Sequence, residues 1–209
     1  SLYLFEKCRS FKDAKELMAA GIYPFFKPIE ASSGARVVTH GIKRVMIGSN
    51  NYLGLTHHPQ VKEAAKQAID LYGTGCTGSR FLNGNLVSHE RLEEDLARFL
   101  RKEACLVFAT GFLANQGALS CLMARNDAIF SDRENHASIV EGTRLSIGET
   151  IRYPHNDMTA LDRLLSEKRS QYDGAMIVSD GVFSMTGEIV NLPGLVKVAS
   201  KYNCKLYID

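Results

Sequence analysis

The sequence contains no tryptophan, few prolines and no apolar run that approaches the about 20 residues of a membrane-spanning helix. Its opening segment, SLYLFEKCRSFKDAKELM, is charged and lacks the apolar core of a signal peptide. Neither sign of charge is in excess, because 25 Lys and Arg face 23 Asp and Glu for a formal net charge of +2. We therefore expect a cytoplasmic protein that has no nucleic-acid partner.

Cysteine is also sparse. The five cysteines are an odd number, lie far apart and include no C-x-x-C pair. This spacing argues against both a disulfide framework and a zinc site, and we expect no bound metal. Cys105, Cys121 and Cys204 lie within apolar runs, so each is predicted to be a small buried side chain.

From His89 onward, strand-like and helix-like segments alternate. The strand-like segments are ACLVFA (104–109), AIFSD (128–132), TIRYP (150–154), GAMIVSD (174–180) and CKLYID (204–209). Helix-like segments separate them, and an amphipathic helix-like segment precedes the first of them. Such alternation requires crossover connections, so we predict an α/β fold with a mostly parallel central sheet and helices on both of its faces.

The chain before this alternation has a different character. We predict a short helix over residues 10–20, a hairpin around Gly41, and a helix that begins at Pro59 and ends at Gly73. Residues 1–58 are interpreted as an N-terminal arm with a hairpin, and residues 59–209 as the first part of a large domain.

The segment GTGCTGSRFLNG, residues 73–84, carries Gly73, Gly75 and Gly78 in the G-x-G-x-x-G spacing of a dinucleotide-binding turn. Such a turn must follow a strand and open a helix. Here the triplet follows a predicted helix and precedes a loop. Its context therefore argues against a dinucleotide site.

Ligands of parallel α/β sheets bind at the carboxyl ends of the strands. Gly111 follows ACLVFA at a helix start, where N–H groups and the helix dipole suit a phosphate, although a plain tight turn has the same pattern. His136 follows AIFSD and is either an ordinary hydrogen-bonding residue or a ring that faces a planar ligand. Asp209 ends CKLYID and needs a cationic partner, for which a protonated heterocycle is favoured over a metal.

Six motifs occur in order along the chain: SNNYLGL, GTGCTGSRFLNG, TGF, NHAS, DGVFSM and LYID. Together they resemble the α-oxoamine synthases, pyridoxal-phosphate enzymes of the aminotransferase fold type I, from about Tyr23 to Asp209. The resemblance implies an aspartate aminotransferase-like transferase with pyridoxal 5′-phosphate as cofactor, and a homodimer with its active site at the interface. It also implies an acyltransferase that joins an amino acid to an acyl-CoA with loss of CO2.

The resemblance assigns roles to five residues. The backbone of Gly111 and Phe112 would bind the cofactor, and the His136 ring would stack on its pyridine ring and meet the substrate carboxylate. Ser184 would hydrogen-bond the cofactor's phenolic oxygen. Asp209 would pair with the pyridine nitrogen and keep it protonated, so that the ring accepts electrons. His136 and Asp209 are thus the predicted catalytic residues.

Two further residues are predicted to bind the substrate. Asn50, in SNNYLGL, matches a position that reaches the carboxylate of the amino acid, although an asparagine of an ordinary turn has the same pattern. Ser79 matches a position that lines the side-chain pocket, where a small hydroxyl is compatible with serine. His89 and His155 recur in family motifs and are interpreted as structural hydrogen-bonding residues.

The motif wording favours the branch that joins L-serine to a long-chain acyl-CoA, palmitoyl-CoA, and forms 3-ketosphinganine in the first step of sphingolipid synthesis. Formation of 8-amino-7-oxononanoate or 2-amino-3-ketobutyrate is the alternative within the family. None of the lysines has the T-x-[SG]-K setting of the family's Schiff-base lysine, so we expect that lysine and a C-terminal small domain beyond residue 209. A non-catalytic homologous subunit is the alternative of another class, and peripheral membrane association stays open.

Overall fold

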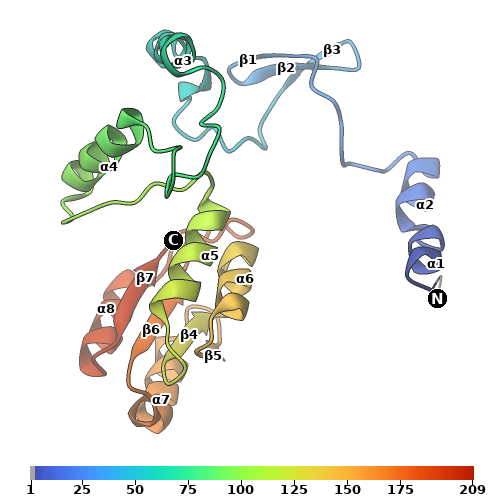
Figure 1. Ribbon diagram of the computed structural model, residues 1–209. Coiled ribbons are helices and arrows are strands. Elements are labelled where there is room, and N and C mark those ends of the chain that lie inside the picture. The colour runs from blue at the N-terminus through green and yellow to red at the C-terminus, as the bar shows by residue number, and fades with distance from the viewer. Residues whose placement is uncertain (1–2) are drawn as a thin grey trace. The chain divides into compact units, whose positions relative to one another are not determined.

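The structure, a computed structural model, describes residues 3–209 (Figure 1). Its contacts divide the chain into two compact units, the first ending at Asn85 and the second running from Leu86 to Asp209. The domain boundary that we predict between residues 58 and 59 lies inside the first unit and stays a prediction.

The first unit contains a three-stranded antiparallel sheet of β1 (Ala31–Ser33), β2 (Arg36–Thr39) and β3 (Ile42–Val45). His40 and Gly41 connect β2 to β3 with φ angles of 51° and 69°. A two-residue turn with both residues in the left-handed region matches the twist of paired strands, and glycine adopts that region without strain. The hairpin predicted around Gly41 is confirmed.

The first unit also contains short helices, which are α1 (Tyr3–Arg9), α2 (Asp13–Ala19), η1 (Leu55–His57) and α3 (Pro59–Tyr72). α3 begins at Pro59, whose missing N–H costs nothing in a first turn. It ends at Gly73, where φ is 77° and the N–H donates to the carbonyl of Ile69 at 2.8 Å. Both α2 and α3 confirm predicted helices, whereas α1 is a helix that the sequence pattern did not indicate.

The second unit is built on a four-stranded sheet in the order β5–β4–β6–β7, with all three strand pairs parallel. Its strands are β4 (Ala128–Asp132), β5 (Glu149–Tyr153), β6 (Ala175–Ser179) and β7 (Lys205–Ile208). The two central strands, β4 and β6, are buried along their whole length, as expected for parallel strands that are covered on both faces. The predicted parallel α/β sheet is confirmed.

Helices cover both faces of this sheet (Figure 1). Leu119 of α5 and Ile139 of α6 belong to the core on one face, whereas Leu161 of α7 and Leu195 of α8 belong to the core on the other. The helices of this unit are α4 (Val87–Leu100), α5 (Gly111–Leu122), α6 (Ala137–Leu145), α7 (Met158–Lys168), η2 (Arg169–Gln171) and α8 (Leu192–Lys201). Each predicted helix from His89 onward is therefore present.

One predicted strand is absent from the described chain. Residues 104–109, ACLVFA, form no strand, and Leu106 is 66% exposed. The N–H of Val107 donates to Glu93 Oε1 at 2.8 Å, whereas in a sheet it would donate to a neighbouring strand. The prediction of a buried strand is wrong here, because an apolar run does not by itself supply a strand to pair with.

The cysteine prediction is wrong at one position. Cys121 of α5 is exposed, while Cys105 and Cys204 are partly buried. A helix buries only one of its faces, so an apolar run does not show which of its residues are covered. Within residues 3–209, no helix combines the length and apolar character that a bilayer crossing requires.

Candidate functional site

The carboxyl ends of β4, β6 and β7 and the start of α5 surround a cavity of about 290 Å³. Its lining residues are Gly111, Phe112, His136, Ser138, Asp180, Val182, Ser184 and Asp209. They meet because parallel strands end at the same edge of a sheet. All five residues predicted at the cofactor site line this one cavity, whereas Ser138, Asp180 and Val182 are additions from the structure.

The start of α5 forms one wall of the cavity. Thr110 caps the helix, and its Oγ1 accepts the N–H of Leu113 at 3.1 Å. The N–H groups of Gly111 and Phe112 belong to the first turn, where no intrahelical acceptor exists. A Cβ placed on Gly111 would meet no atom within 4 Å, so this residue borders open space. The wall therefore offers backbone donors and a helix dipole to an anion.

Asp209, at the end of β7, is held by a buried amide. Asn115 Nδ2 donates to Asp209 Oδ2 at 2.7 Å and to Ser138 Oγ at 2.8 Å, and Asn115 Oδ1 accepts the Tyr207 hydroxyl at 2.7 Å. Ser138 Oγ lies 2.7 Å from His136 Nδ1. One chain of hydrogen bonds thus fixes both the Asp209 carboxylate and the His136 ring. Asn115 lies one helical turn after Gly111, and this i, i+4 spacing is the signal that could have found it.

His136 is the N-cap of α6. Its Nδ1 also accepts the N–H of Ser138 at 3.2 Å, which leaves the Nε2 side of the ring free of this cap. The backbone N–H of His136 donates to Asp180 Oδ2 at 2.6 Å. The ring borders the cavity and belongs to an exposed residue, so one of its faces is accessible to a planar ligand.

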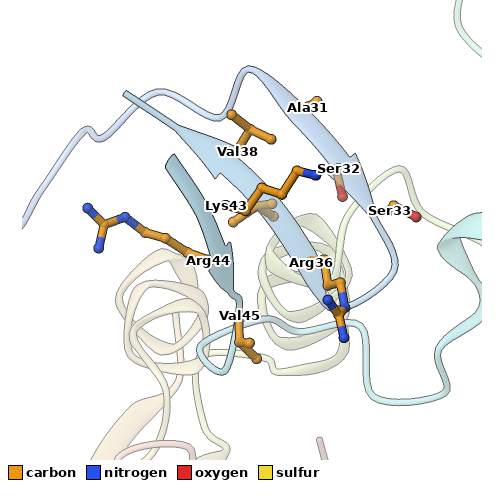
Figure 2. A pocket seen from close by; sticks show the side chains of 9 residues that line it. Ala31, Ser32, Ser33, Arg36, Val38, Lys43, Arg44 and Val45 are labelled. Atoms are coloured by element: carbon orange, nitrogen blue, oxygen red, sulfur yellow. The ribbon is translucent and has the colours of Figure 1, made fainter. Parts of the chain in front are cut away.

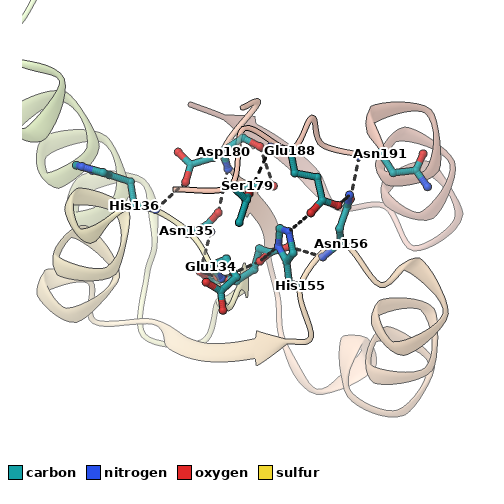
Figure 3. Close-up of polar contacts among 12 residues, drawn as sticks. Glu134, Asn135, His136, His155, Asn156, Ser179, Asp180, Glu188 and Asn191 are labelled. Carbon is teal, nitrogen blue, oxygen red and sulfur yellow. Dashed lines mark hydrogen bonds and ion pairs between the residues drawn. The ribbon is translucent and has the colours of Figure 1, made fainter. Parts of the chain in front are cut away.

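Asp180 is a carboxylate in the cavity wall that sequence reasoning missed, although it directly follows the buried strand β6. It is 7% exposed, and its N–H donates to Asn135 Oδ1 at 2.9 Å (Figure 3). Burial raises the pKa of Asp180 above its ordinary value, the hydrogen bond from His136 opposes this rise, and the nearby negative charge of Asp209 adds to it.

Ser184 reaches the cavity on a short hairpin, residues 181–190, here called the Gly181–Val190 hairpin. Val182 and Ile189 form an antiparallel bridge, and the N–H of Phe183 donates to the carbonyl of Glu188 at 2.9 Å. Phe183 is 2% exposed and anchors the hairpin in the core, whereas the neighbouring Ser184 is exposed at the cavity.

Asn50 and Ser79 lie in the first unit, whereas all residues that line this cavity belong to the second unit. Asn50 Oδ1 accepts the hydroxyl of Tyr52 at 3.4 Å. The carbonyl of Ser79 accepts the N–H groups of residues 82–84 at distances of 2.9–3.2 Å. Both predictions of substrate contact stay predictions.

Close contacts within the glycine-rich loop explain why two of its positions are glycine. A Cβ on Gly84 would collide with the carbonyl group of Gly78, and a Cβ on Gly78 would collide with the side chain of Asn83. The loop therefore folds back on itself so closely that its backbone excludes a side chain at Gly84, whereas at Gly78 the Asn83 side chain would have to move. This compact turn follows α3, which agrees with the argument against a dinucleotide site.

The three-stranded sheet of the first unit borders a cavity of about 350 Å³. Figure 2 shows the side chains that line it. Arg36, Lys43 and Arg44 contribute cationic side chains to its lining, and Val38 and Val45 contribute apolar ones. None of the residues predicted to bind cofactor or substrate lines it.

Comparisons with known proteins give a consistent result. The family described as aminotransferase class I and II matches residues 43–209. A serine palmitoyltransferase from Bacteriovorax stolpii is 52% identical over 207 residues, which cover 96% of this chain and 49% of the relative. An 8-amino-7-oxononanoate synthase from Geobacter sulfurreducens is 47% identical over 197 residues, which cover 94% of this chain and 50% of the relative.

A solved structure gives the same picture. Serine palmitoyltransferase from S. paucimobilis, with a bound PLP–myriocin aldimine, superposes with a TM-score of 0.93 at 32% identity. The superposition covers 100% of this chain and 52% of the other. The chain thus spans about half the length of the curated relatives that it matches.

The raised pKa of Asp180 predicts how stability changes with pH. A carboxyl group whose folded-state pKa is raised binds its proton more tightly in the folded state, so stability falls as pH rises from the unfolded-state pKa through the folded-state pKa. Asp180→Asn keeps an acceptor for the His136 N–H and removes the buried charge. We expect the variant and the wild type to have equal free energies of unfolding near pH 3, measured by urea unfolding. Toward pH 7 the variant should become increasingly more stable than the wild type.

Asp157→Asn is the matched control, because Asp157 caps α7 at an exposed position and asparagine caps equally well. A stability difference between Asp180→Asn and the wild type that stays constant between pH 3 and pH 7 would contradict the assignment.

Proposed function

Because the chain belongs to the aminotransferase class I and II family and, within it, to the α-oxoamine synthases, we propose that it is the cofactor-binding part of an enzyme that joins L-serine to a long-chain acyl-CoA. The products are 3-ketosphinganine, free CoA and CO2. The observation that carries the proposal is the meeting of Gly111, Phe112, His136, Ser184 and Asp209 at one cavity.

Pyridoxal 5′-phosphate is the cofactor of this family, and a solved relative holds it. The α5 wall fits its phosphate side. The N–H groups of Gly111 and Phe112 are free to donate, and the helix dipole places partial positive charge there. Gly111 also leaves open the space that a Cβ would fill, so a ligand can approach the backbone.

The opposite side of the cavity fits the ring of the cofactor. Asp209 presents a carboxylate whose position Asn115 fixes at 2.7 Å, which suits a protonated pyridine nitrogen. The His136 ring supplies a flat face, and Ser184 supplies a hydroxyl. When bound, pyridoxal phosphate supplies an electron sink for the substrate's α-carbon. The protein's part is to hold the ring, keep its nitrogen protonated and orient the substrate.

The preference for L-serine is supported by two observations. Ser79 lies in the glycine-rich loop whose wording is typical of the serine-using branch, and a 52% identical relative carries that activity in its name. Asn50 is proposed to bind the carboxylate of the amino acid. The 47% identical relative favours a second candidate, 8-amino-7-oxononanoate synthase activity.

We further propose a homodimer whose interface includes the first unit. Val37 is the one buried apolar residue among residues 3–85, whereas Tyr52, Leu53, Phe81 and Leu82 are between 79% and 94% exposed. Exposed apolar surface of this extent is typical of a surface that another part of the protein or a partner covers. A second copy of the chain is the partner that the family resemblance implies.

Sedimentation velocity of the full-length protein tests the homodimer, and we expect the mass of a dimer at micromolar concentration. Phe81→Asp replaces a 94% exposed apolar side chain of the first unit with a charged one. It should raise the dissociation constant of the dimer by about tenfold or more. Leu145→Asp, at the end of α6 in the second unit, is the control and should leave the mass unchanged. A monomer at every concentration would contradict the proposal.

Asp209→Asn tests the cofactor site. The substitution keeps the shape of the side chain and removes the charge that pairs with the pyridine nitrogen, so affinity for pyridoxal phosphate should fall by about tenfold or more. Absorbance titration of the full-length protein measures this affinity. Asp157→Asn should bind like the wild type, and equal affinity of all three proteins would refute the role of Asp209.

Substrate choice is tested by CoA release from the full-length holoenzyme. We expect L-serine with palmitoyl-CoA to give a higher kcat/KM than L-alanine with pimeloyl-CoA or glycine with a short-chain acyl-CoA. A preference for L-alanine with pimeloyl-CoA would establish the second candidate instead. Release of CoA from none of the pairs would support a non-catalytic subunit.

A further inference from the structure

His155 lies between two carboxylates at the carboxyl end of β5. Its Nδ1 is 2.9 Å from Asp132 Oδ1, and its Nε2 is 3.1 Å from Glu188 Oε2 (Figure 3). A neutral imidazole carries one N–H and can donate to only one of them. An imidazolium donates to both, so the surroundings favour the charged ring.

Asp132 is the fixed end of this arrangement. Its side chain is completely buried, and it also accepts the N–H groups of Glu134 at 2.9 Å and Asn156 at 2.8 Å. A buried carboxylate is costly unless it is hydrogen-bonded and paired with a positive charge. His155 supplies that charge from the adjacent strand end.

Glu188 is the movable end, because it belongs to the Gly181–Val190 hairpin and its side chain is 47% exposed. Glu188 Oε1 also accepts Asn156 Nδ2 at 2.9 Å, and Asn156 Oδ1 accepts the N–H of Asn191 at 2.9 Å. The His155 ring packs edge-on against Phe183, with 4.3 Å between ring centres and an interplanar angle of 86°. His155 thus contacts side chains of the hairpin, whereas Asn156 contacts the Glu188 side chain, donates to the carbonyl of Ile189 at 3.4 Å and accepts an N–H just beyond the hairpin.

The hairpin is the element that brings Val182 and Ser184 to the cavity. Phe183 lies between them in sequence and points into the core, where His155 contacts it. A shift of the hairpin at Phe183 or Glu188 would therefore move the two cavity residues beside Phe183.

We propose that His155 is a positioning residue, which ties the hairpin to the buried Asp132 and so sets the position of Ser184 at the cavity. This tie, the pair of hydrogen bonds that His155 makes to Asp132 and Glu188, is a property of the fold. Its consequence for pyridoxal phosphate rests on the proposed function, because only a bound cofactor makes the position of Ser184 matter.

The tie should depend on pH. Desolvation is the largest single influence on the pKa of His155 and lowers it, but the hydrogen bonds and charges of Asp132 and Glu188 together outweigh it, so this pKa is raised. Two other titratable groups interact with Asp132. Burial raises the pKa of Tyr153 of β5, so its hydroxyl stays neutral, and burial, with a smaller contribution from the charge of Asp132, raises the pKa of Asp180. The stabilisation that protonated His155 gives to the folded hairpin is therefore complete at pH values below its unfolded-state pKa. It is lost as the pH rises through the folded-state pKa.

Hydrogen exchange of the full-length protein, without cofactor, tests the tie. The reporters are the hairpin amides of Phe183, Gly187 and Val190, which donate to carbonyl groups within the hairpin. We compare His155→Gln and Glu188→Gln with the wild type. In each variant the protection factors of these hairpin amides should fall about tenfold, which is the effect of losing one charge-assisted hydrogen bond. Protection in the wild type, corrected for intrinsic exchange, should fall between pH 6 and pH 9 and stay flat in His155→Gln.

The control is His89→Gln. His89 is also partly buried, accepts the N–H of Leu86 at 3.0 Å, and pairs with no carboxylate in the described part of the chain. It should leave the hairpin unchanged. Should His155→Gln lose protection throughout the second unit, Glu188→Gln decides, because its site is half exposed and its loss should stay local. Unchanged hairpin exchange in Glu188→Gln, or a pH profile that His155→Gln shares with the wild type, would overturn the proposal.

Titration with pyridoxal phosphate separates the two proposals. If the wild type binds it, both variants should bind about three- to tenfold more weakly, while His89→Gln should not change. Failure of the wild type to bind would reject the proposed function and leave the exchange result as the test of His155. Unchanged affinity in variants with a loosened hairpin would reject only the link from the hairpin to the cofactor.

Discussion

The buried amide of Asn135 joins the ends of the two central strands, and the candidate site depends on this link. Asn135 Nδ2 donates to the carbonyl of Val178 at 2.9 Å and to Ser131 Oγ at 3.0 Å, and Asn135 Oδ1 accepts the N–H of Asp180. Because β4 and β6 are covered on both faces, backbone groups at their ends cannot rely on water and need protein partners. Asn135 supplies them, and so holds the turn that carries His136 at a fixed distance from the end of β6.

The same requirement shapes the rest of the cavity edge. Asn115 joins α5 to the end of β7 through Asp209 and Tyr207, and His155 joins the end of β5 to the hairpin that carries Ser184. Each linking side chain is polar and shielded from water to some degree, so leaving it unpaired would cost free energy. Mutual pairing therefore restricts the edge to one arrangement. The site is positioned by bonds between elements rather than by any single loop.

Much of this organisation could be predicted from the sequence. The alternation of apolar strand-like and amphipathic helix-like segments was enough for the parallel sheet, because each period reflects a local geometry. The rule that ligands bind at strand ends pointed to Gly111, His136 and Asp209 as candidates, and the family resemblance added Ser184. The strand predicted at ACLVFA was wrong because a strand exists only with a partner, and no local pattern contains that partner.

The residues that hold the site were harder to foresee. Asn115, Asn135 and Asp180 look like ordinary polar residues of a helix, a turn and a strand end, and only their partners distinguish them. His155 was interpreted as structural. Its position between Asp132 and Glu188 shows which element it contacts, the Gly181–Val190 hairpin. By itself, the sequence determined the order of elements and the residues at their ends, because periodicity and turn chemistry act over short distances. Only the tertiary structure decided which of these residues meet, because hydrogen bonds between distant segments form only after the sheet has brought the strand ends together.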